Sequence, residues 1–418
     1  MHLNGWDTVI VSDLHPLNAA LKASTEKLLS SFSASQNDFR ASGKFGAWSL
    51  VVGATGDNVM LETPITSGEM QMNDESEPID ISGTRPQSVV TLHLVPSSTN
   101  NALKELKFNF KDVSSDAGKG AVYPHDVLDS GCLTFIQKAA LGNAVAKAFV
   151  NNADDISFVF ASINPLNNSK LAWLEPKTSR YSFLNPSGAP PALAIFSTTS
   201  VRDVSKLSTL VGPKLLSGAG DAGLAISEDL FLQYILAPVL LHGLGASGDL
   251  KVQNSALVNT GSLSLPKVEK AGESYHPKIE HLSAVVTDTQ ITVTISGSCD
   301  MHLGIHMDFK ASSDLKVSLS ADGKALQFDS IGTPTFHKDV HIPWYDHLFD
   351  IVAAVSEIIL QVTVSAISKG ISGSVSSKVV GDDIVKYAPS IVSWAGKDAF
   401  GMRDVFLADS LCCRGILQ

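Results

Sequence analysis

The segment "CDMHLGIHMDF" (residues 299–309) decides between a helical and a β interpretation of the second half of this chain. Its residues alternate strictly between a polar and an apolar set. The polar set is Asp300, His302, Gly304, His306 and Asp308, and the apolar set is Met301, Leu303, Ile305, Met307 and Phe309. A period of two is typical of a strand and not of a helix. The segment therefore predicts a strand with one solvated face and one apolar face that another element must cover.

The histidines of this segment also raise the question of a metal site. His302 and His306 have the i, i+4 spacing that places two zinc ligands on one face of a helix. On a strand the same spacing separates the two side chains by roughly 13 Å, because a strand rises about 3.3 Å per residue. We therefore interpret the polar set as a solvated strand face and expect no metal there.

The same alternation recurs on both sides of this segment. Strand-like stretches include residues 47–65 around a turn at Gly53–Asn58, 89–96, 106–113, 156–163, 290–298, 314–321 and 324–331. Apolar stripes of helical period predict helices at about 14–33, at 133–150, from an N-cap near Ser227, and at 344–368. Each half thus runs from a helix through a meander of strands to a long helix. Parallel βαβ alternation is absent from the sequence, so we expect an α+β fold in which helices cover antiparallel sheets.

Composition and charge exclude several classes of protein. The 418 residues are 44% apolar and 17% charged, which favours a folded chain of one long domain or two. A net charge of −11 argues against nucleic acid as the main partner and against a general attraction to anionic membranes. Cys132, Cys299, Cys412 and Cys413 have neither metal-ligand spacing nor the density of a disulfide scaffold. We expect free thiols in a reducing compartment.

Targeting signals are weak in this sequence. The start, "MHLNGWDTVIVSD", lacks the basic and apolar regions of a signal peptide. The most apolar helical run, 230–244, is shorter than the ~20 residues that a membrane span needs, and Pro238 interrupts it. We expect a soluble protein that is cytoplasmic as synthesised and has no transmembrane segment. Export by a route that reads no N-terminal signal stays open.

Two patterns imitate functional motifs but lack the context that those motifs need. Gly218, Gly220 and Gly223 fit G-x-G-x-x-G, yet no good strand precedes them, so a loop is the favoured interpretation. Residues 337–347, "HKDVHIPWYDH", could assemble a metal site from His337, Asp339, His341, Asp346 and His347 if the chain turned at Pro343. We favour a polar strand edge that leads into a helix. No nucleophile or carboxylate-pair motif stands out, so we expect no enzyme, no cofactor and no metal.

Three stretches resemble one known family. The first is "NGWDTVIVSDLHPLNAALKAS" (4–24), where Asn4–Thr8 open the motif and Asn18 and Leu21 continue it. The second is "LAISEDLFLQYILAPVLL" (224–241), with Ile226, Ser227, Phe231 and Pro238 in place. The third is "YAPSIVSWAG" (387–396) followed by "FLADSLCCRGIL" (406–417), around Val392, Trp394 and Gly396. From end to end, the chain resembles the P-forty-seven proteins of clostridial neurotoxin gene clusters.

This resemblance implies a fold and a function. The family, with the OrfX proteins of the same clusters, belongs to the tubular lipid-binding (TULIP) superfamily, and the bactericidal/permeability-increasing protein is a distant relative. Such folds wrap a curved antiparallel sheet around a long helix, and an apolar groove between them often holds lipid. We expect an elongated protein of two tandem TULIP-like modules, 1–190 and 191–418, with the boundary between 185 and 225. No catalytic residues carry over from this family.

The expected groove defines the candidate site. Apolar surface in excess of one helix face places the candidate lipid-groove residues at Leu230, Phe231, Tyr234 and Ile235, with Ile351, Val355 and Ile358 opposite. The sequence leaves two functions open. The first is binding of a lipid or other hydrophobic ligand, as an accessory protein of a toxin-like gene cluster. The second is a protein-interaction scaffold with a filled core, whose partners are encoded by the same cluster.

Overall fold

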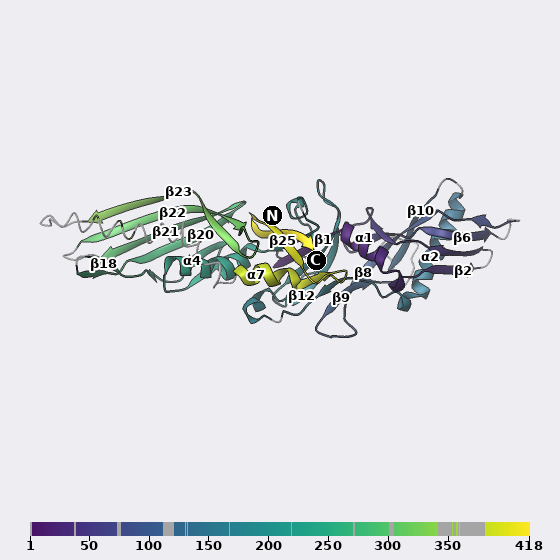
Figure 1. Ribbon diagram of the computed structural model, residues 1–418, viewed down its shortest axis with the longest axis horizontal. Coiled ribbons are helices and arrows are strands. Elements are labelled where there is room, and N and C mark those ends of the chain that lie inside the picture. The colour runs from purple at the N-terminus through teal and green to yellow at the C-terminus, as the bar shows by residue number, and fades with distance from the viewer. Residues whose placement is uncertain are drawn as a thin grey trace.

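The computed structural model describes residues 2–418, apart from 37–38, 73–76, 112–120, 130, 132, 167, 219, 271, 301–304, 342–352, 354–356, 358 and 360–380. In the described part the chain forms an elongated molecule built mainly of sheets, and both chain ends lie near its middle (Figure 1). The strand pairs between described residues are antiparallel, as in β1 with β13 and β21 with β22. The expected mixed fold with antiparallel sheets is confirmed, with strands outweighing helices.

A central sheet joins the two halves of the chain. Its strand order is β12-β13-β1-β14-β26-β25. The strands are β1 (Thr8–Asp13), β12 (Thr178–Leu184), β13 (Ala192–Thr198), β14 (Ala222–Ile226), β25 (Phe400–Ala408) and β26 (Ser410–Leu417). The loop at 185–191 therefore connects two neighbouring strands of one sheet. The division into modules 1–190 and 191–418 stays a prediction.

Two sheets build the N-terminal end of the molecule. The larger has the order β24-β11-β9-β8-β5-β4, with β10 also paired to β8, and the smaller has the order β2-β3-β6-β7. The larger contains β4 (Ser49–Val51), β5 (Asn58–Glu62), β8 (Arg85–Pro96), β9 (Lys104–Phe108), β10 (Val122–Leu128), β11 (Val159–Ile163) and β24 (Val392–Trp394). The smaller contains β2 (Ser31–Gln36), β3 (Phe39–Phe45), β6 (Ile65–Met72) and β7 (Ile79–Asp80). The hairpin predicted around Gly53–Asn58 is confirmed as β4 and β5.

Helix α2 (Phe135–Asn151) packs on these sheets and confirms the helix predicted at 133–150. A core of aromatic rings lies beneath it. Neighbouring ring centroids in this core are 4.7 to 6.1 Å apart, which is contact distance for aromatic pairs. Its members are Phe32, Phe45, Trp48, Phe108, Phe110, Phe149, Phe158 and Phe160. Side chains therefore fill the core of the N-terminal end.

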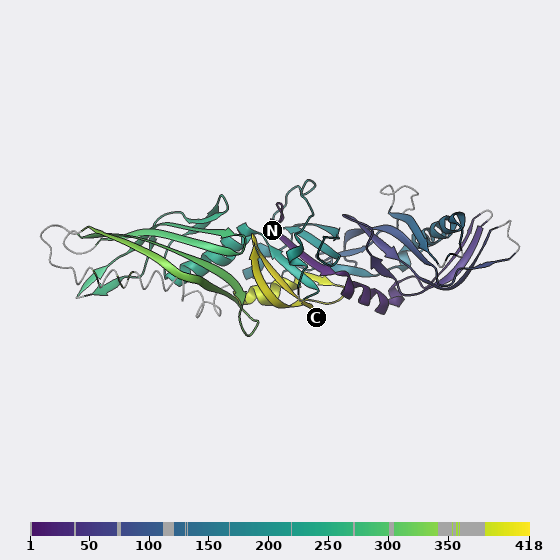
Figure 2. The ribbon, with the colours of Figure 1, turned by 90° about the horizontal axis from the view of Figure 1, so that it is seen from above.

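A long sheet forms the C-terminal end, with the order β15-β16-β20-β21-β22-β23 and with β17 paired to β20. Seen from above, its long green strands form a twisted sheet that reaches from the outer end to the middle of the molecule (Figure 2). The strands are β15 (Leu250–Gln253), β16 (Ala256–Asn259), β17 (Leu263–Ser264), β20 (Lys278–Thr287), β21 (Gln290–Asp300), β22 (His306–Leu319) and β23 (Leu326–His341). A separate hairpin pairs β18 (Val268–Lys270) with β19 (Glu273–Tyr275).

The helix expected from Ser227 is confirmed, with an internal change of type. It begins as α3 (Glu228–Leu230), continues as a π-helical turn, η5 (Phe231–Leu236), and ends as α4 (Ala237–Leu244). The Ala237 N–H bonds the carbonyl of Leu232, five residues back. Pro238 has no N–H, and its ring excludes the carbonyl four residues earlier. The wider turn before Pro238 is the usual accommodation.

The first helix is shorter than the predicted 14–33. α1 (Leu14–Ala23) is followed by a 3-10 turn, η1 (Thr25–Lys27), and then by β2. Leu28 and Phe32 continue the helical phase and are buried, but they reach the core from the turn and the strand. In "SFSASQ" the serines alternate with Phe32 and Ala34, which suits a strand with one solvated face. Serine is also a poorer helix former than leucine or alanine.

The single strand predicted at 299–309 is wrong. The chain reverses there, because β21 ends at Asp300, β22 begins at His306, and these two residues face each other across an antiparallel pair. Directly opposed residues share one face of a sheet, so the polar residues remain together in spite of the reversal. The other predicted strands of this region are confirmed as β21, β22 and β23.

Some predicted elements lie only partly within the described residues. Of the helix predicted at 344–368, Ala353, Glu357 and Ile359 are described and are helical, and the remainder lies outside the described residues. The tail contains α7 (Gly381–Tyr387), the 3-10 turn η7 (Ala388–Ile391) and strands. Short 3-10 turns also occur at η2 (Ala153–Asp155), η3 (Ser169–Leu174) and η4 (Pro213–Leu215). Cys299, Cys412 and Cys413 are free buried thiols, as predicted, and Cys132 lies outside the described residues.

Candidate functional site

The predicted groove residues on α3 and η5 do not share one environment. Phe231 and Ile235 are 0% and 1% exposed and belong to the main hydrophobic core. The Phe231 ring lies 6.3 Å from that of Phe328 on β23, so this helix face meets the C-terminal sheet. Leu230 is partly buried and packs against the same core. The structure therefore places Phe231 against the sheet, and Leu230 and Ile235 pack into the same hydrophobic core.

Tyr234 points away from this core. It is 41% exposed, and its ring stacks on Trp173 of η3, with centroids 4.8 Å apart and planes 6° apart. The stack joins η5 to η3, so Tyr234 does not face the inner side of the C-terminal sheet as the predicted groove requires. The opposite wall, Ile351, Val355 and Ile358, lies outside the described residues, so the predicted pairing of the two walls stays a prediction.

The inner face of the C-terminal sheet is apolar along its length. The buried apolar side chains of its three middle strands are Ile279, Leu282, Ala284 and Val286 on β20, Ile291, Val293, Ile295 and Cys299 on β21, and Met307, Phe309, Ala311, Leu315 and Val317 on β22. Sequence reasoning did not single out these residues as a site. The alternation of residues 278–319 is the signal that could have found them.

A row of small side chains crosses the middle of this face. Val293 on β21 lies directly between Ala284 on β20 and Ser313 on β22. All three are buried, and the Ser313 hydroxyl lies 3.1 Å from that of Ser330 on β23. The one polar atom of the row is thus satisfied within the sheet. Larger side chains flank the row, since Ile291 faces Leu315 across the same strand pair.

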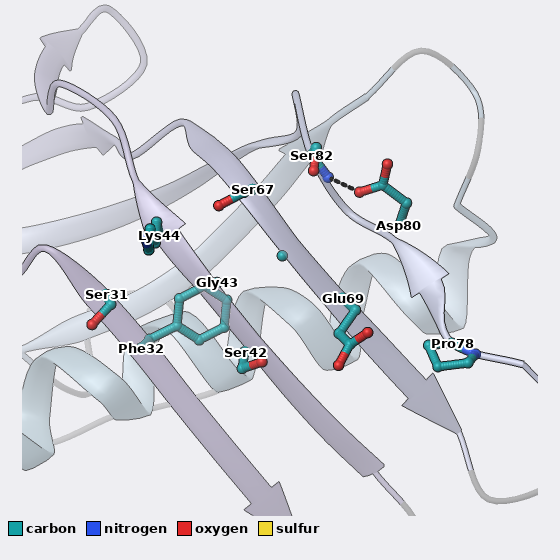
Figure 3. A pocket seen from close by; sticks show the side chains of 11 residues that line it. Ser31, Phe32, Ser42, Gly43, Lys44, Ser67, Glu69, Pro78, Asp80 and Ser82 are labelled. Atoms are coloured by element: carbon teal, nitrogen blue, oxygen red, sulfur yellow. Dashed lines mark hydrogen bonds between the residues drawn. The ribbon is translucent and has the colours of Figure 1, made fainter.

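A hollow of about 630 Å³ lies at the opposite end of the molecule, on the small sheet β2-β3-β6-β7 (Figure 3). Its lining contains serine side chains, the charged Lys44, Glu69 and Asp80, and the apolar Phe32 and Pro78. Figure 3 shows Asp80 accepting a hydrogen bond of 2.9 Å from the Ser82 N–H, and the bonds from Ser82 lower the pKa of Asp80. The lining thus combines apolar surface with charged groups.

A third group of side chains lies where β21 and β23 end and β22 begins. His306 Nδ1 is 2.7 Å from Asp300 Oδ1, and His306 Nε2 is 3.2 Å from Asp308 Oδ1. His341 Nε2 is 3.7 Å from Asp308 Oδ2, and the two imidazole rings lie 6.4 Å apart. The hydrogen-bonded Asp300 carboxylate raises the pKa of His306. His302, Asp346 and His347 lie outside the described residues.

Membership of a family follows from comparison with known proteins. A family model described as OrfX-like, "Protein OrfX2/OrfX3/P47", matches residues 3–409. The chain therefore belongs to the OrfX-like family, and the resemblance stated from its sequence is confirmed. In the described part of the chain, no helix has both the length and the apolar character needed to cross a membrane.

Particular relatives are similar over most of their length. The chain is 26% identical over 356 residues to Protein P47 of Clostridium botulinum (strain Kyoto / Type A2), which covers 82% of this chain and 84% of the relative. It is 19% identical over 477 aligned positions to Protein OrfX3 of Paraclostridium bifermentans, covering 99% and 96%. The structure of P47 from Clostridium botulinum A2 superposes with a TM-score of 0.81 at 23% identity, covering 100% of this chain and 98% of that one. The two chains share a fold.

Proposed function

We propose that the protein binds a lipid or another hydrophobic ligand against the inner face of its C-terminal sheet and catalyses no reaction. The observation that carries this proposal is the apolar face of β20, β21 and β22, with its row of small side chains at Ala284, Val293 and Ser313. An acyl chain along such a face gains about 0.8 kcal/mol for each buried methylene. Binding therefore needs no charged contact.

The contrast between the two ends supports the C-terminal location. Aromatic rings fill the core of the N-terminal end, and charged side chains stand in the lining of the hollow on its small sheet. Neither is a continuous apolar face of the kind that the C-terminal sheet presents. The C-terminal sheet presents small side chains in the middle of its apolar face, where a ligand would meet the least steric resistance.

The family supplies the setting of the proposal. Its resemblance to TULIP proteins implies long helices packed in curved sheets, arranged as two tandem modules, with lipid between helix and sheet. The resemblance also implies an accessory role in a toxin-like gene cluster, with proteins of the same cluster as partners. Leu230, Phe231 and Ile235 are the described residues that would border the ligand on the helix side.

A matched pair of substitutions tests the ligand site. Val293 and Val145 are both fully buried, the first in the C-terminal sheet and the second in α2. In a filled core Val→Trp overpacks and costs about 1–3 kcal/mol or more. We expect V145W to lower the unfolding temperature and to leave binding of a fluorescent polyene fatty acid intact. We expect V293W to reduce the bound fatty acid while unfolding close to the wild-type temperature.

Two results contradict this proposal. One is the absence of saturable fatty-acid binding by the wild-type chain. The other is destabilisation of V293W to the same degree as V145W, because the C-terminal core would then be filled by side chains like the N-terminal one.

The alternative function is a protein-interaction scaffold with a filled core. The burial of Phe231 and Ile235 in the main core favours this alternative, since both side chains are almost fully enclosed by protein. A scaffold should capture a protein encoded by the same gene cluster in stoichiometric amount. It should carry solvent-extractable lipid only at the level of an unrelated control protein.

A further inference from the structure

Two segments that are far apart in the sequence meet at the end of α7, which lies near the middle of the molecule (Figure 1). The antiparallel register of β11 and β24 places Ser162 opposite Ser393 and Ile163 opposite Val392. The chain that leaves β11 therefore lies beside the chain that enters β24. The second segment contains "YAPSIVSWAG" (387–396), the third stretch that carries the family resemblance.

Asn164 holds the two segments together. Its backbone N–H donates to the Ile391 carbonyl at 2.9 Å. Its side-chain amide nitrogen donates to the Ser390 carbonyl at 2.8 Å and to the Ser393 hydroxyl at 2.7 Å. The amide oxygen can accept hydrogen bonds as well, and in the described part of the chain it has no partner. The two segments are thus fixed as walls, and one acceptor of Asn164 remains available.

A hollow of about 680 Å³, which we call the central hollow, lies between these walls. Its volume is in the range of small-molecule sites. Asn164, Asn168 and Ser169 come from one wall, and two serines come from the other. The Asn168 side-chain oxygen accepts from the Lys170 N–H at 3.0 Å, and none of the described residues accepts from its amide nitrogen. The central hollow therefore offers uncharged donors and acceptors together.

The charge of the lining restricts the class of ligand. Among the described residues that line the central hollow, Asp398 is the only charged one. The lysines beside the hollow in sequence have other contacts. Lys397 donates to the Leu417 carbonyl at 3.1 Å, and the Lys386 ammonium lies 4.9 Å from the centre of the Tyr387 ring. This lining does not suit a phosphate or another anion, whereas a carboxylate accepts strong hydrogen bonds from hydroxyl groups.

The remaining part of the lining is apolar. It consists of Pro165, Leu166 and the ring of Tyr387. A tyrosine side chain presents an apolar body and a polar tip. A sugar ring is divided in a similar way, because its hydroxyl groups lie at its edges and its C–H groups form apolar patches on its faces. The central hollow provides partners for both parts.

We propose that the central hollow binds an uncharged carbohydrate, such as the terminal disaccharide of a neutral glycan. Asp398 and the amide oxygen of Asn164 accept from sugar hydroxyls, and the amide nitrogen of Asn168 donates to a sugar oxygen. Tyr387 and Pro165 pack against C–H groups of the ring. A sialylated or sulfated sugar is disfavoured, because Asp398 and the net charge of −11 repel it. This proposal is independent of the proposed ligand site on the C-terminal sheet.

An array of neutral glycans and their terminally sialylated forms, probed with the fluorescently labelled full chain, tests the proposal. We expect saturable binding to a subset of the neutral glycans, competition by the same glycans in solution, and little binding to the sialylated forms. D398A should weaken the binding by about 10-fold or more, because it removes a charged acceptor. The matched control is D155A, which removes an exposed carboxylate of η2 outside the central hollow. It should bind like the wild type.

Thermal unfolding separates a ligand contact from a structural effect. Asp398 and Asp155 are both exposed, so both variants should unfold at the wild-type temperature. V293W should retain glycan binding, so the two proposed sites can fail separately. The proposal is overturned if the wild type binds no neutral glycan of the array or binds the sialylated forms equally well. It is also overturned if D398A binds as tightly as D155A.

Discussion

At the scale of single residues, the side chain of Asn18 joins the first helix to the sheet beside it. Its amide nitrogen donates to the Leu50 carbonyl at 2.9 Å, and its amide oxygen accepts from the Leu50 N–H at 2.8 Å. The same N-terminal motif fixes a distant loop, since Asp7 accepts from the Thr199 N–H and pairs with Arg202. Trp6 Nε1 donates to the carbonyl of Ser208. The residues that carry the family resemblance here have structural roles.

Replacement of Asn18 tests that role. N18A leaves the N–H and C=O of Leu50 without partners at a part-buried position, which costs about 1–3 kcal/mol in the free energy of unfolding. Chemical denaturation followed by tryptophan fluorescence would measure the loss. The control H15A, on the exposed side of the same helix, should change stability by no more than about 0.5 kcal/mol. Equal stability of the two variants would contradict the assigned role.

At the scale of elements, α2 begins with a capping box that fixes its start. Gln137 N–H donates to the Thr134 hydroxyl, and the Thr134 N–H donates to the Gln137 side chain at 2.8 Å. Both free N–H groups thus gain a partner at the helix start. The "TFIQ" signature at residues 134–137 is visible in the sequence and predicts this start once it is recognised.

The contribution of this cap to stability can be predicted. T134A removes the hydroxyl acceptor and should lower the free energy of unfolding by about 1 kcal/mol. T134S keeps the acceptor and should stay within a few tenths of the wild type. Urea midpoints of the two variants measure the difference. Equal midpoints for T134A and T134S would show that the cap contributes nothing to stability.

The elements also show what the sequence could and could not predict. Alternation predicted the faces of the strands, because side-chain period depends only on local backbone geometry. It could not predict the reversal between Asp300 and His306. These two residues pair across antiparallel strands and so lie on the same face of the sheet, and the polar–apolar alternation of the sequence is unbroken between them. The predicted 14–33 helix was too long for a similar reason, since Leu28 and Phe32 stay in helical phase while belonging to other elements.

The candidate sites also combine features that the sequence predicts with features that it does not. The apolar character around Phe231 and Ile235 was predictable from the sequence, because it is a property of one helix. The outward direction of Tyr234 was not, because it depends on Trp173 of η3, which is distant in the chain. The meeting of His306 with His341 depends on the register of β22 and β23, which long-range packing sets.

At the scale of the whole molecule, one hydrophobic core runs from the N-terminal sheets through the centre to the C-terminal sheet. The central sheet carries this continuity, because β1 and β26 both pair with β14. The two ends differ in how the core is filled. Rings occupy the N-terminal end, and small side chains lie in the middle of the C-terminal sheet. This difference is the basis of the proposed ligand site.

Native mass spectrometry of the purified full chain, followed by solvent extraction and lipid analysis, tests that claim most directly. We predict a stoichiometric adduct that extracts as a fatty acid or phospholipid and that is reduced in V293W. A clean mass of the chain alone, with nothing enriched over an unrelated control protein, would contradict the claim. The proteins encoded by the same gene cluster would then be the partners to test.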